Sequence, residues 1–169
     1  QLCLVAAQIG NGGYKIYPKM VLNDHEDLEH NDKYMPLFKD ENNIKIIQEA
    51  MFSSTNEVMG TSYRSRIDDP KYQFAGKTGT AQVKRITAEE RELDLKTFEI
   101  PYEQRDHALY IAFGPYKNPR YALSIVIEHG GSGGSVAAPL AKKMFKMIID
   151  RHETRKNFDK KKKFRYLNV

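Results

Sequence analysis

Two near-continuous apolar runs stand in the second half of the chain, at residues 107–113 and 121–128. Residues 114–120 between them are rich in glycine, proline and asparagine, which favour tight turns. This order predicts an antiparallel β-hairpin. Because neither run alternates cleanly with polar residues, we expect helices to cover both faces of the sheet that contains the hairpin.

Three other segments have the spacing of helices. Residues 2–9 are mostly apolar and lead into Gly10-Asn11-Gly12-Gly13, whose residues tolerate the left-handed conformation that ends helices. A second helix is expected to begin near Asp40, which can cap it, and to end at Gly60. Its apolar face is predicted to consist of Ile44, Ile47, Met51 and Val58.

The last helix is expected to have Pro139 in its first turn, where a missing N–H costs nothing. Its apolar stripe is predicted to be Leu140, Met144, Phe145, Ile148 and Ile149. The helices and the hairpin together indicate an α+β fold, with an antiparallel sheet covered by helices.

Polar or mixed segments separate these elements. Residues 14–22 contain Pro18 and can form at most a short edge strand. Residues 23–40 have few apolar positions and are interpreted as a surface excursion. Residues 84–106 are crowded with charge and form an insertion between strands, in which 88–96 could make a short exposed helix.

The net charge of +5 is concentrated at the C-terminus. Eight Lys or Arg stand against two acids in residues 151–169, a net of +6, which leaves −1 for residues 1–150. The body is therefore not basic, and nucleic acid is not expected as a partner. We predict that residues 1–158 form one partial domain and that 159–169 form a solvated basic tail with little contact with the sheet.

The number and spacing of the cysteines and histidines predict no metal site and no redox centre. Cys3 is the only cysteine, and the five histidines lack the H-E-x-x-H spacing of a zinc site. We therefore expect neither a metal nor another cofactor. The sequence also lacks a run of about 18 apolar residues, so no membrane-spanning helix is predicted within it.

The candidate chemistry lies in Lys77-Thr78-Gly79-Thr80, inside a predicted strand that is entered from 72–74 and left through 81–83. Lysine supplies a fixed positive charge and the two threonines supply hydroxyls. Glycine has no Cβ, so Gly79 would let another backbone come close. This combination of a positive charge and hydroxyl donors predicts a binding site for a carboxylate.

Two other motifs match part of this chain. Gly76-Lys77-Thr78 resembles the end of a phosphate loop, but Lys71 stands where that loop needs its first glycine. Residues 130–134 match the G-x-S-x-G nucleophile elbow around Ser132. An elbow needs an acid and a histidine on later loops, whereas the only downstream histidine, His152, lies in the last predicted helix. We therefore interpret 130–134 as a flexible connection from strand to helix.

The strand motif and three further stretches resemble the C-terminal part of class B penicillin-binding proteins, most of all the penicillin-binding protein 2 type. The four stretches are 77–83, 107–113, 121–128 and 130–139. The resemblance implies the C-terminal portion of a penicillin-binding transpeptidase fold, which is similar to that of serine β-lactamases. The family has three motifs, S-x-x-K, S-x-N or S-x-D, and K-T-G, and only the third is expected here.

The other two motifs are missing from the expected places. No S-x-x-K occurs in the sequence. Ser54-Thr55-Asn56 matches S-x-N, but in the family that motif precedes the helix with which this chain begins, so we interpret the match as a coincidence. The resemblance thus implies that the nucleophilic serine lies outside this sequence and that these 169 residues alone are inactive.

The activity implied by the resemblance is that of a serine-type D,D-transpeptidase, an acyltransferase of peptidoglycan synthesis. Such an enzyme attacks a D-Ala-D-Ala stem peptide, forms an acyl-enzyme and passes the acyl group to an amine, while β-lactams such as penicillin trap its serine. By resemblance, Lys77, Thr78, Gly79 and Thr80 are catalytic-site residues. The Thr78 and Thr80 hydroxyls would bind the terminal carboxylate, and the Thr80 N–H would be one oxyanion donor.

The resemblance also implies a cellular setting. The intact protein would lie at the periplasmic face of a bacterial inner membrane and work with a membrane glycosyltransferase of the elongation machinery that maintains cell shape. Two alternatives stay open, a non-catalytic sensor that binds β-lactams and a division-type transpeptidase; the stretch 130–139 favours elongation. We expect the isolated chain to self-associate, because surface meant for the absent half would be apolar.

Overall fold

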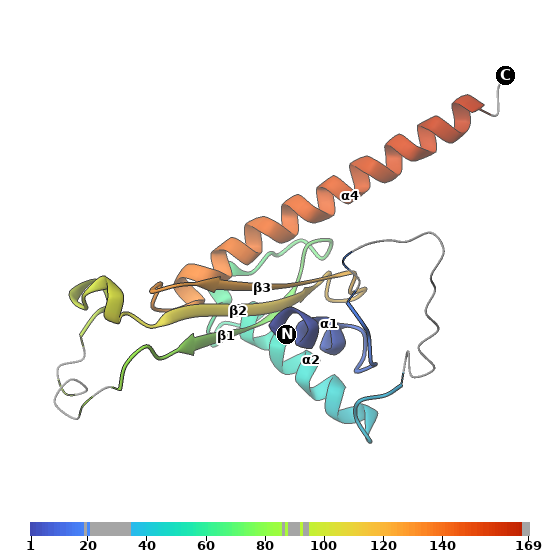
Figure 1. Ribbon diagram of the computed structural model, residues 1–169. Helices are drawn as coiled ribbons and strands as arrows, with labels where there is room; N and C mark the ends of the chain where they lie inside the picture. Colours follow the sequence, from blue (N-terminus) through green and yellow to red (C-terminus); the bar gives the residue numbers. More distant parts are fainter. Residues whose placement is uncertain (19, 21–34, 86, 88–91, 93–94, 167–169) are drawn as a thin grey trace.

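A three-stranded antiparallel sheet forms the centre of the molecule (Figure 1). The computed structural model describes residues 1–18, 20, 35–85, 87, 92 and 95–166. The strands are β1 (Ala75–Ala81), β2 (His107–Gly114) and β3 (Tyr121–Ile127), in the order β1-β2-β3. The predicted hairpin is therefore confirmed as β2 and β3, and β1 is an outer strand of the described sheet.

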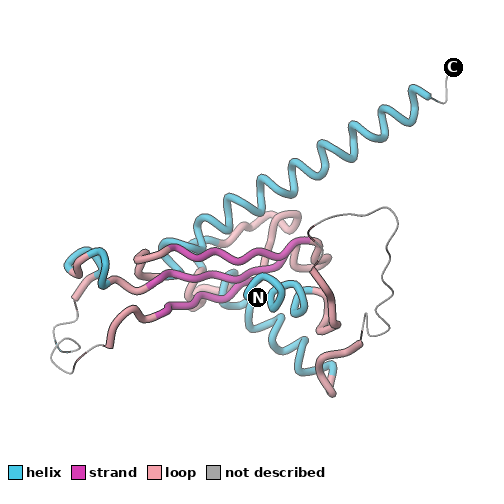
Figure 2. Tube along the Cα trace, viewed as in Figure 1, coloured by secondary structure: helices cyan, strands magenta, loops and turns pink. Residues whose placement is uncertain are grey.

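Helices cover both faces of this sheet, as predicted. Helices α1 (Leu2–Gly10) and α2 (Glu41–Asn56) pack against one face, and α4 (Ala138–Tyr166) lies across the other (Figure 2). The α+β class expected from the sequence is thus confirmed. Within the described residues, no helix combines the length and the apolar character needed to cross a bilayer.

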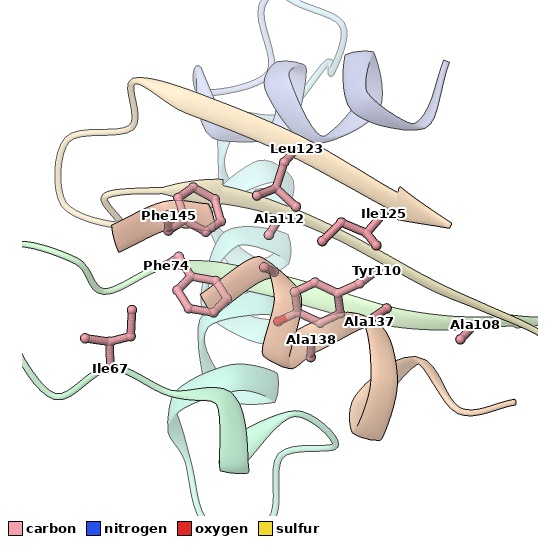
Figure 3. Close-up of a cluster of buried hydrophobic side chains, with 11 residues drawn as sticks. Ile67, Phe74, Ala108, Tyr110, Ala112, Leu123, Ile125, Ala137, Ala138 and Phe145 are labelled. Atoms are coloured by element: carbon pink, nitrogen blue, oxygen red, sulfur yellow. The ribbon is translucent and has the colours of Figure 1, made fainter. Parts of the chain in front are cut away.

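The larger core lies between the sheet and the start of α4. Phe74, at the entrance of β1, stacks on Phe145 of α4 with ring centroids 4.8 Å apart (Figure 3). Small residues let this helix approach the sheet closely, since Ala138 and Ala141 are completely buried. The predicted stripe was partly wrong for this reason: the buried line runs through the alanines, whereas Leu140 and Met144 are 38% and 42% exposed.

Helix α2 begins as predicted but ends earlier. The Asp40 carboxylate accepts a hydrogen bond from the backbone N–H of Asn42 at 2.8 Å, so the cap is confirmed. The helix stops at Asn56, and Val58, predicted to lie on its apolar face, is 74% exposed. The Asn56 amide donates to the carbonyl of Phe74 at 3.0 Å, so a contact with the sheet fixes the end of the helix.

Gly60 follows the end of α2 in a tight turn. A Cβ at this position would lie 2.3 Å from the carbonyl oxygen of Ser54, so only glycine fits. The first helix ends in the predicted way, because Gly12 and Gly13 both have positive φ angles, of 93° and 86°.

The less regular segments are described only in part. Residues 14–22 were predicted to form at most a short edge strand, and in their described part an isolated bridge joins Tyr14 to Pro36. Residues 97–99 and 102–104 form short 3₁₀ turns. Most of the excursion at 23–40 and of the helix expected at 88–96 lies outside the described residues.

The C-terminal helix runs on without a break beyond the predicted boundary at 158, as far as Tyr166 (Figure 1). Asp150 of this helix accepts hydrogen bonds from the Tyr72 hydroxyl and the Lys71 ammonium, which join the helix to the segment before β1. The Tyr72 hydrogen bond, followed by that of Lys71, lowers the pKa of the Asp150 carboxyl. The division into a domain at 1–158 and a tail at 159–169 stays a prediction.

Candidate active site

The K-T-G strand presents its side chains to two sides. Thr78 and Thr80 pair with Tyr110 and Ala108 of β2, whose side chains are buried on the α4 side of the sheet. Directly opposed residues of an antiparallel pair share a face, so Thr78 and Thr80 point to that side and Lys77 to the α2 side. Thr78 and Thr80 thus share one face of an outer strand, as the alternation of side chains along a strand requires.

The glycine-rich loop lies directly on this strand. Gly133 comes so close that a Cβ there would stand 2.3 Å from the carbonyl oxygen of Leu109 and 2.8 Å from that of Gly79. A Cβ at Gly134 would lie 3.6 Å from the Thr78 Cγ2. The loop is therefore on the same side of the sheet as the two threonines.

The close backbone approach expected at Gly79 exists, but its cause differs from the prediction. A Cβ on Gly79 would meet only the Leu109 Cβ, at 3.3 Å, because it would project to the opposite face. The residue that must lack a Cβ is Gly133. The loop connects β3 to α4 as predicted, and its last part, Gly133–Ala137, forms a π-helical turn that leads straight into α4.

Two cavities adjoin the strand. One, of about 330 Å³, is lined by Thr80, by Gly131 and Ser132 of the loop and by residues of the 95–106 segment. The other, of about 390 Å³, lies on the α2 side and is lined by Lys77, Thr61 and the end of α2. The strand thus borders a hollow at each of its faces.

The Lys77 ammonium is held in place by hydrogen bonds to Thr78 and not by a carboxylate of the described residues. Its ammonium donates to the carbonyl of Thr78 at 2.9 Å and to the Thr78 hydroxyl at 3.5 Å. Within the part of the chain that the structure describes, no carboxylate forms an ion pair with it. Its charge is therefore available to an anionic ligand at Thr78.

A hydroxyl chain that the sequence did not reveal joins α2 to this strand. The Thr61 oxygen lies 3.2 Å from the Thr78 oxygen and 3.2 Å from the Ser54 oxygen. The only signal in the sequence was Gly60-Thr61-Ser62, where Gly60 was interpreted simply as a helix stop. The contact depends on the turn that brings 61 back over α2, which a helix continued to Gly60 would not make.

A buried cluster beneath the strand supports this turn. The Tyr110 hydroxyl lies 2.8 Å from the Thr55 hydroxyl and 3.1 Å from that of Ser62, and none of the three residues is more than 1% exposed. Burial raises the pKa of Tyr110. A Cβ at Gly76 would stand 2.2 Å from the Tyr110 oxygen, so the glycine of the strand makes room for the cluster.

This cluster also explains the S-x-N match at 54–56. Thr55 bonds to Tyr110, and Asn56 donates to the carbonyls of Phe52 and Phe74. Both side chains hold α2 against the sheet. The interpretation of the match as a coincidence stays a prediction.

Replacing Tyr110 with phenylalanine is expected to destabilise the protein by about 1–3 kcal/mol, because buried hydroxyls of Thr55 and Ser62 lose their shared partner. Urea unfolding measures the change. Tyr72→Phe is the control, since its hydroxyl bonds to the exposed Asp150, and it should cost less. Equal losses in the two variants would contradict a special role for the buried cluster.

The nucleophile-elbow alternative gains no geometric support. Asp150 is engaged with Lys71 and Tyr72, and His152 packs edge-on against Tyr121 with ring centroids 5.9 Å apart. Ser132 precedes the π-helical turn and is exposed. In the described residues, no group of three or more His, Cys, Asp or Glu side chains is arranged to hold a metal ion.

Comparisons with known sequences place this strand and loop in one family. The family model of the penicillin binding protein transpeptidase domain matches residues 1–146. Peptidoglycan D,D-transpeptidase MrdA of Salmonella typhimurium is 38% identical over 105 residues, 62% of this chain and 16% of the relative. MrdA of Acinetobacter baumannii is 34% identical over 151 residues, 86% of this chain and 21% of the relative. The chain thus spans about a fifth or less of the length of these relatives.

Solved structures give the same result. PBP2 of Pseudomonas aeruginosa, in complex with WCK 5153, matches 83% of this chain and 28% of its own with a TM-score of 0.63 and 28% identity. The Helicobacter pylori PBP2 in its complex with MreC matches 73% of this chain and 20% of its own, with a TM-score of 0.57 and 27% identity. The match over residues 1–146, which include the K-T-G strand and the glycine loop, means that this chain belongs to the penicillin-binding protein transpeptidase domain family.

Proposed function

We propose that this chain forms the K-T-G side of the active site of a peptidoglycan D,D-transpeptidase of the penicillin-binding protein 2 type. The observation that carries the proposal is the placement of Lys77, Thr78 and Thr80 on an outer strand directly beneath the Gly133 loop. The two MrdA relatives, which carry that enzyme's name, support it. The substrate would be a D-Ala-D-Ala stem peptide, and penicillin would bind in its place.

The strand would hold the anionic end of the substrate. Lys77 already donates to the Thr78 oxygen, so its charge would reach a carboxylate bound at the Thr78 and Thr80 hydroxyls. The backbone N–H of Thr80 would be one of two oxyanion donors, and removing such a donor typically slows acyl transfer about 10²- to 10³-fold. The serine that attacks the carbonyl, and the lysine that activates it, would come from outside this sequence.

A second segment of the protein would cover the apolar surface that α1, α2 and the turn after α2 expose. Several large apolar side chains of α1, α2 and the following turn are strongly exposed. They are Leu2, Val5, Ile46, Val58 and Met59. Their exposure supports the proposal that the nucleophile-bearing part packs here, and that the isolated chain self-associates through the same surface.

The cellular setting is proposed on the same grounds. We place the intact protein at the periplasmic face of a bacterial inner membrane, with a membrane glycosyltransferase of the elongation machinery as its partner. The Helicobacter pylori relative was solved in a complex with MreC, which is in keeping with an assembly of this kind.

The test is acylation of the whole protein encoded by the source gene. Fluorescent penicillin should label it stoichiometrically, and peptide mapping should find the adduct on a serine outside these 169 residues. Lys77→Ala should lower the labelling rate about 10²-fold, by loss of the charge that faces the carboxylate. Lys71→Ala is the matched control, because Lys71 pairs with Asp150 and Glu153 on α4, and it should label at close to the normal rate. Absence of labelling, or an adduct on a serine of this sequence, would overturn the proposal.

A further inference from the structure

Thr61 is the one hydroxyl residue that touches the K-T-G strand from outside the sheet among the described contacts. Its oxygen lies 3.2 Å from that of Thr78, and its side chain is exposed to the cavity that Lys77 also lines. A ligand carboxylate at the Thr78 hydroxyl would therefore arrive beside a second hydroxyl. A carboxylate has about four acceptor positions, so donors from Thr78 and Thr80 leave room for a third.

The position of Thr61 is fixed by its surroundings. Its neighbour Ser62 donates from the backbone N–H and from the hydroxyl to the Ser54 carbonyl, both at 3.0 Å, and its hydroxyl also contacts the buried Tyr110. On the other side, a Cβ at Gly134 would stand 2.5 Å from the Thr61 carbonyl oxygen. Thr61 is thus held between α2 and the glycine loop, and little ordering would be needed when a ligand binds.

We propose that Thr61 is a third hydroxyl donor to the carboxylate of the stem peptide or β-lactam, beside Thr78 and Thr80. This inference rests on the proposed transpeptidase function. It assigns to the carboxylate site a residue that lies 17 positions before Thr78, in the turn after α2. Thr61 would bind the ligand, and Ser54 would position Thr61.

When a carboxylate is bound, each of the hydroxyls of Ser54, Thr61 and Thr78 still has a hydrogen-bond partner. Each hydroxyl has one proton to donate and can accept as well. The Ser54 hydroxyl would donate to Thr61, Thr61 would donate to the carboxylate, and Thr78 would donate to the carboxylate while still accepting from Lys77. In the empty site the three hydroxyls satisfy one another instead. A ligand would therefore need only rotation of two hydroxyl protons.

The experiment compares benzylpenicillin with its methyl ester, which lacks the negative charge, as acylating agents of the whole protein. Thr61→Val, which removes the hydroxyl and keeps the shape, should slow acylation by benzylpenicillin about tenfold, the effect of losing a hydrogen bond to a charged group. Acylation by the ester should change by less than about twofold. Thr61→Ser, which keeps the hydroxyl, should restore most of the rate with benzylpenicillin. Ser54→Ala should slow acylation by benzylpenicillin by less than Thr61→Val does, and it should leave acylation by the ester unchanged.

Ser53→Ala is the matched control. Ser53 lines the same cavity but its hydroxyl donates to Glu57, at 2.8 Å, so both reagents should react at the normal rate. If Thr61→Val slows both reagents equally, or neither, the inference is wrong, since Thr61 then acts through packing or not at all. If the unaltered protein does not react with penicillin, the proposed function itself fails. Melting temperatures of all variants separate these results from loss of folding.

Discussion

Benzylpenicillin is expected to leave the mass of the 169-residue chain unchanged, even after prolonged incubation. The acylated atom in this family is a serine oxygen activated by a nearby lysine, and the sequence contains no S-x-x-K. The serines nearest the strand do not replace it. Ser54 contacts Thr61, and in the described residues neither Ser54 nor Ser132 has a hydrogen bond to a lysine or a histidine.

Intact-mass spectrometry and denaturing electrophoresis with fluorescent penicillin measure this result. The whole protein, treated in parallel, is the positive control and should gain one penicilloyl group. A stoichiometric adduct on the isolated chain would contradict the expectation. The nucleophile would then have to be sought within the sequence, with Ser132 first, because it is exposed at the cavity lined by Thr80.

The sheet could be predicted because its signals are local. The runs at 107–113 and 121–128 are apolar almost throughout, and the turn between them has the residues that turns need. The alternation of side chains along a strand then placed Thr78 and Thr80 together without knowledge of the rest of the fold. Asp40 was found by the same kind of local rule, since an N-cap residue contacts backbone only two positions away.

The missed features all depend on contacts between distant parts of the chain. Helix α2 ends at Asn56 because its amide reaches Phe74, 18 residues later. The neighbours of Thr61 come from α2, from β1 and from the glycine loop. The alanines of α4 carry weak apolar signals, and only the close packing on the sheet shows why they, and not Leu140 and Met144, are buried.

The glycine pattern illustrates the same limit. Both Gly79 and Gly133 were evident as glycines, and Gly79 was chosen because it stands in the strand motif. Which of two facing backbones needs to lack a Cβ depends on the direction in which each Cβ would project. That direction follows from the register with β2, where Gly79 pairs with Leu109, and from the path of a loop some 50 residues away.

Replacing Gly133 with alanine is therefore expected to reduce both the stability of the protein and its reaction with penicillin. The new Cβ would lie 2.3 Å from the Leu109 carbonyl oxygen and 2.8 Å from that of Gly79, and both belong to a backbone fixed by the sheet. The loop would have to lift off the strand. Overpacking of this kind typically costs about 1–3 kcal/mol of stability, and more when backbone must move.

The lifted loop should also impair the reaction. A shift of about 1 Å in a group that positions substrate can cost about 10²-fold in rate, so the acylation rate of the whole protein with penicillin should fall by about that factor. Ser135→Ala is the control in the same loop, because Ser135 is exposed and its hydroxyl makes only a long contact, 3.4 Å, with the carbonyl of Ser132. It should change neither the melting temperature nor the rate appreciably. Gly133→Ala could instead behave like Ser135→Ala in both measurements. The loop would then not be in tight contact with the K-T-G strand, and the proposed site could not depend on that contact.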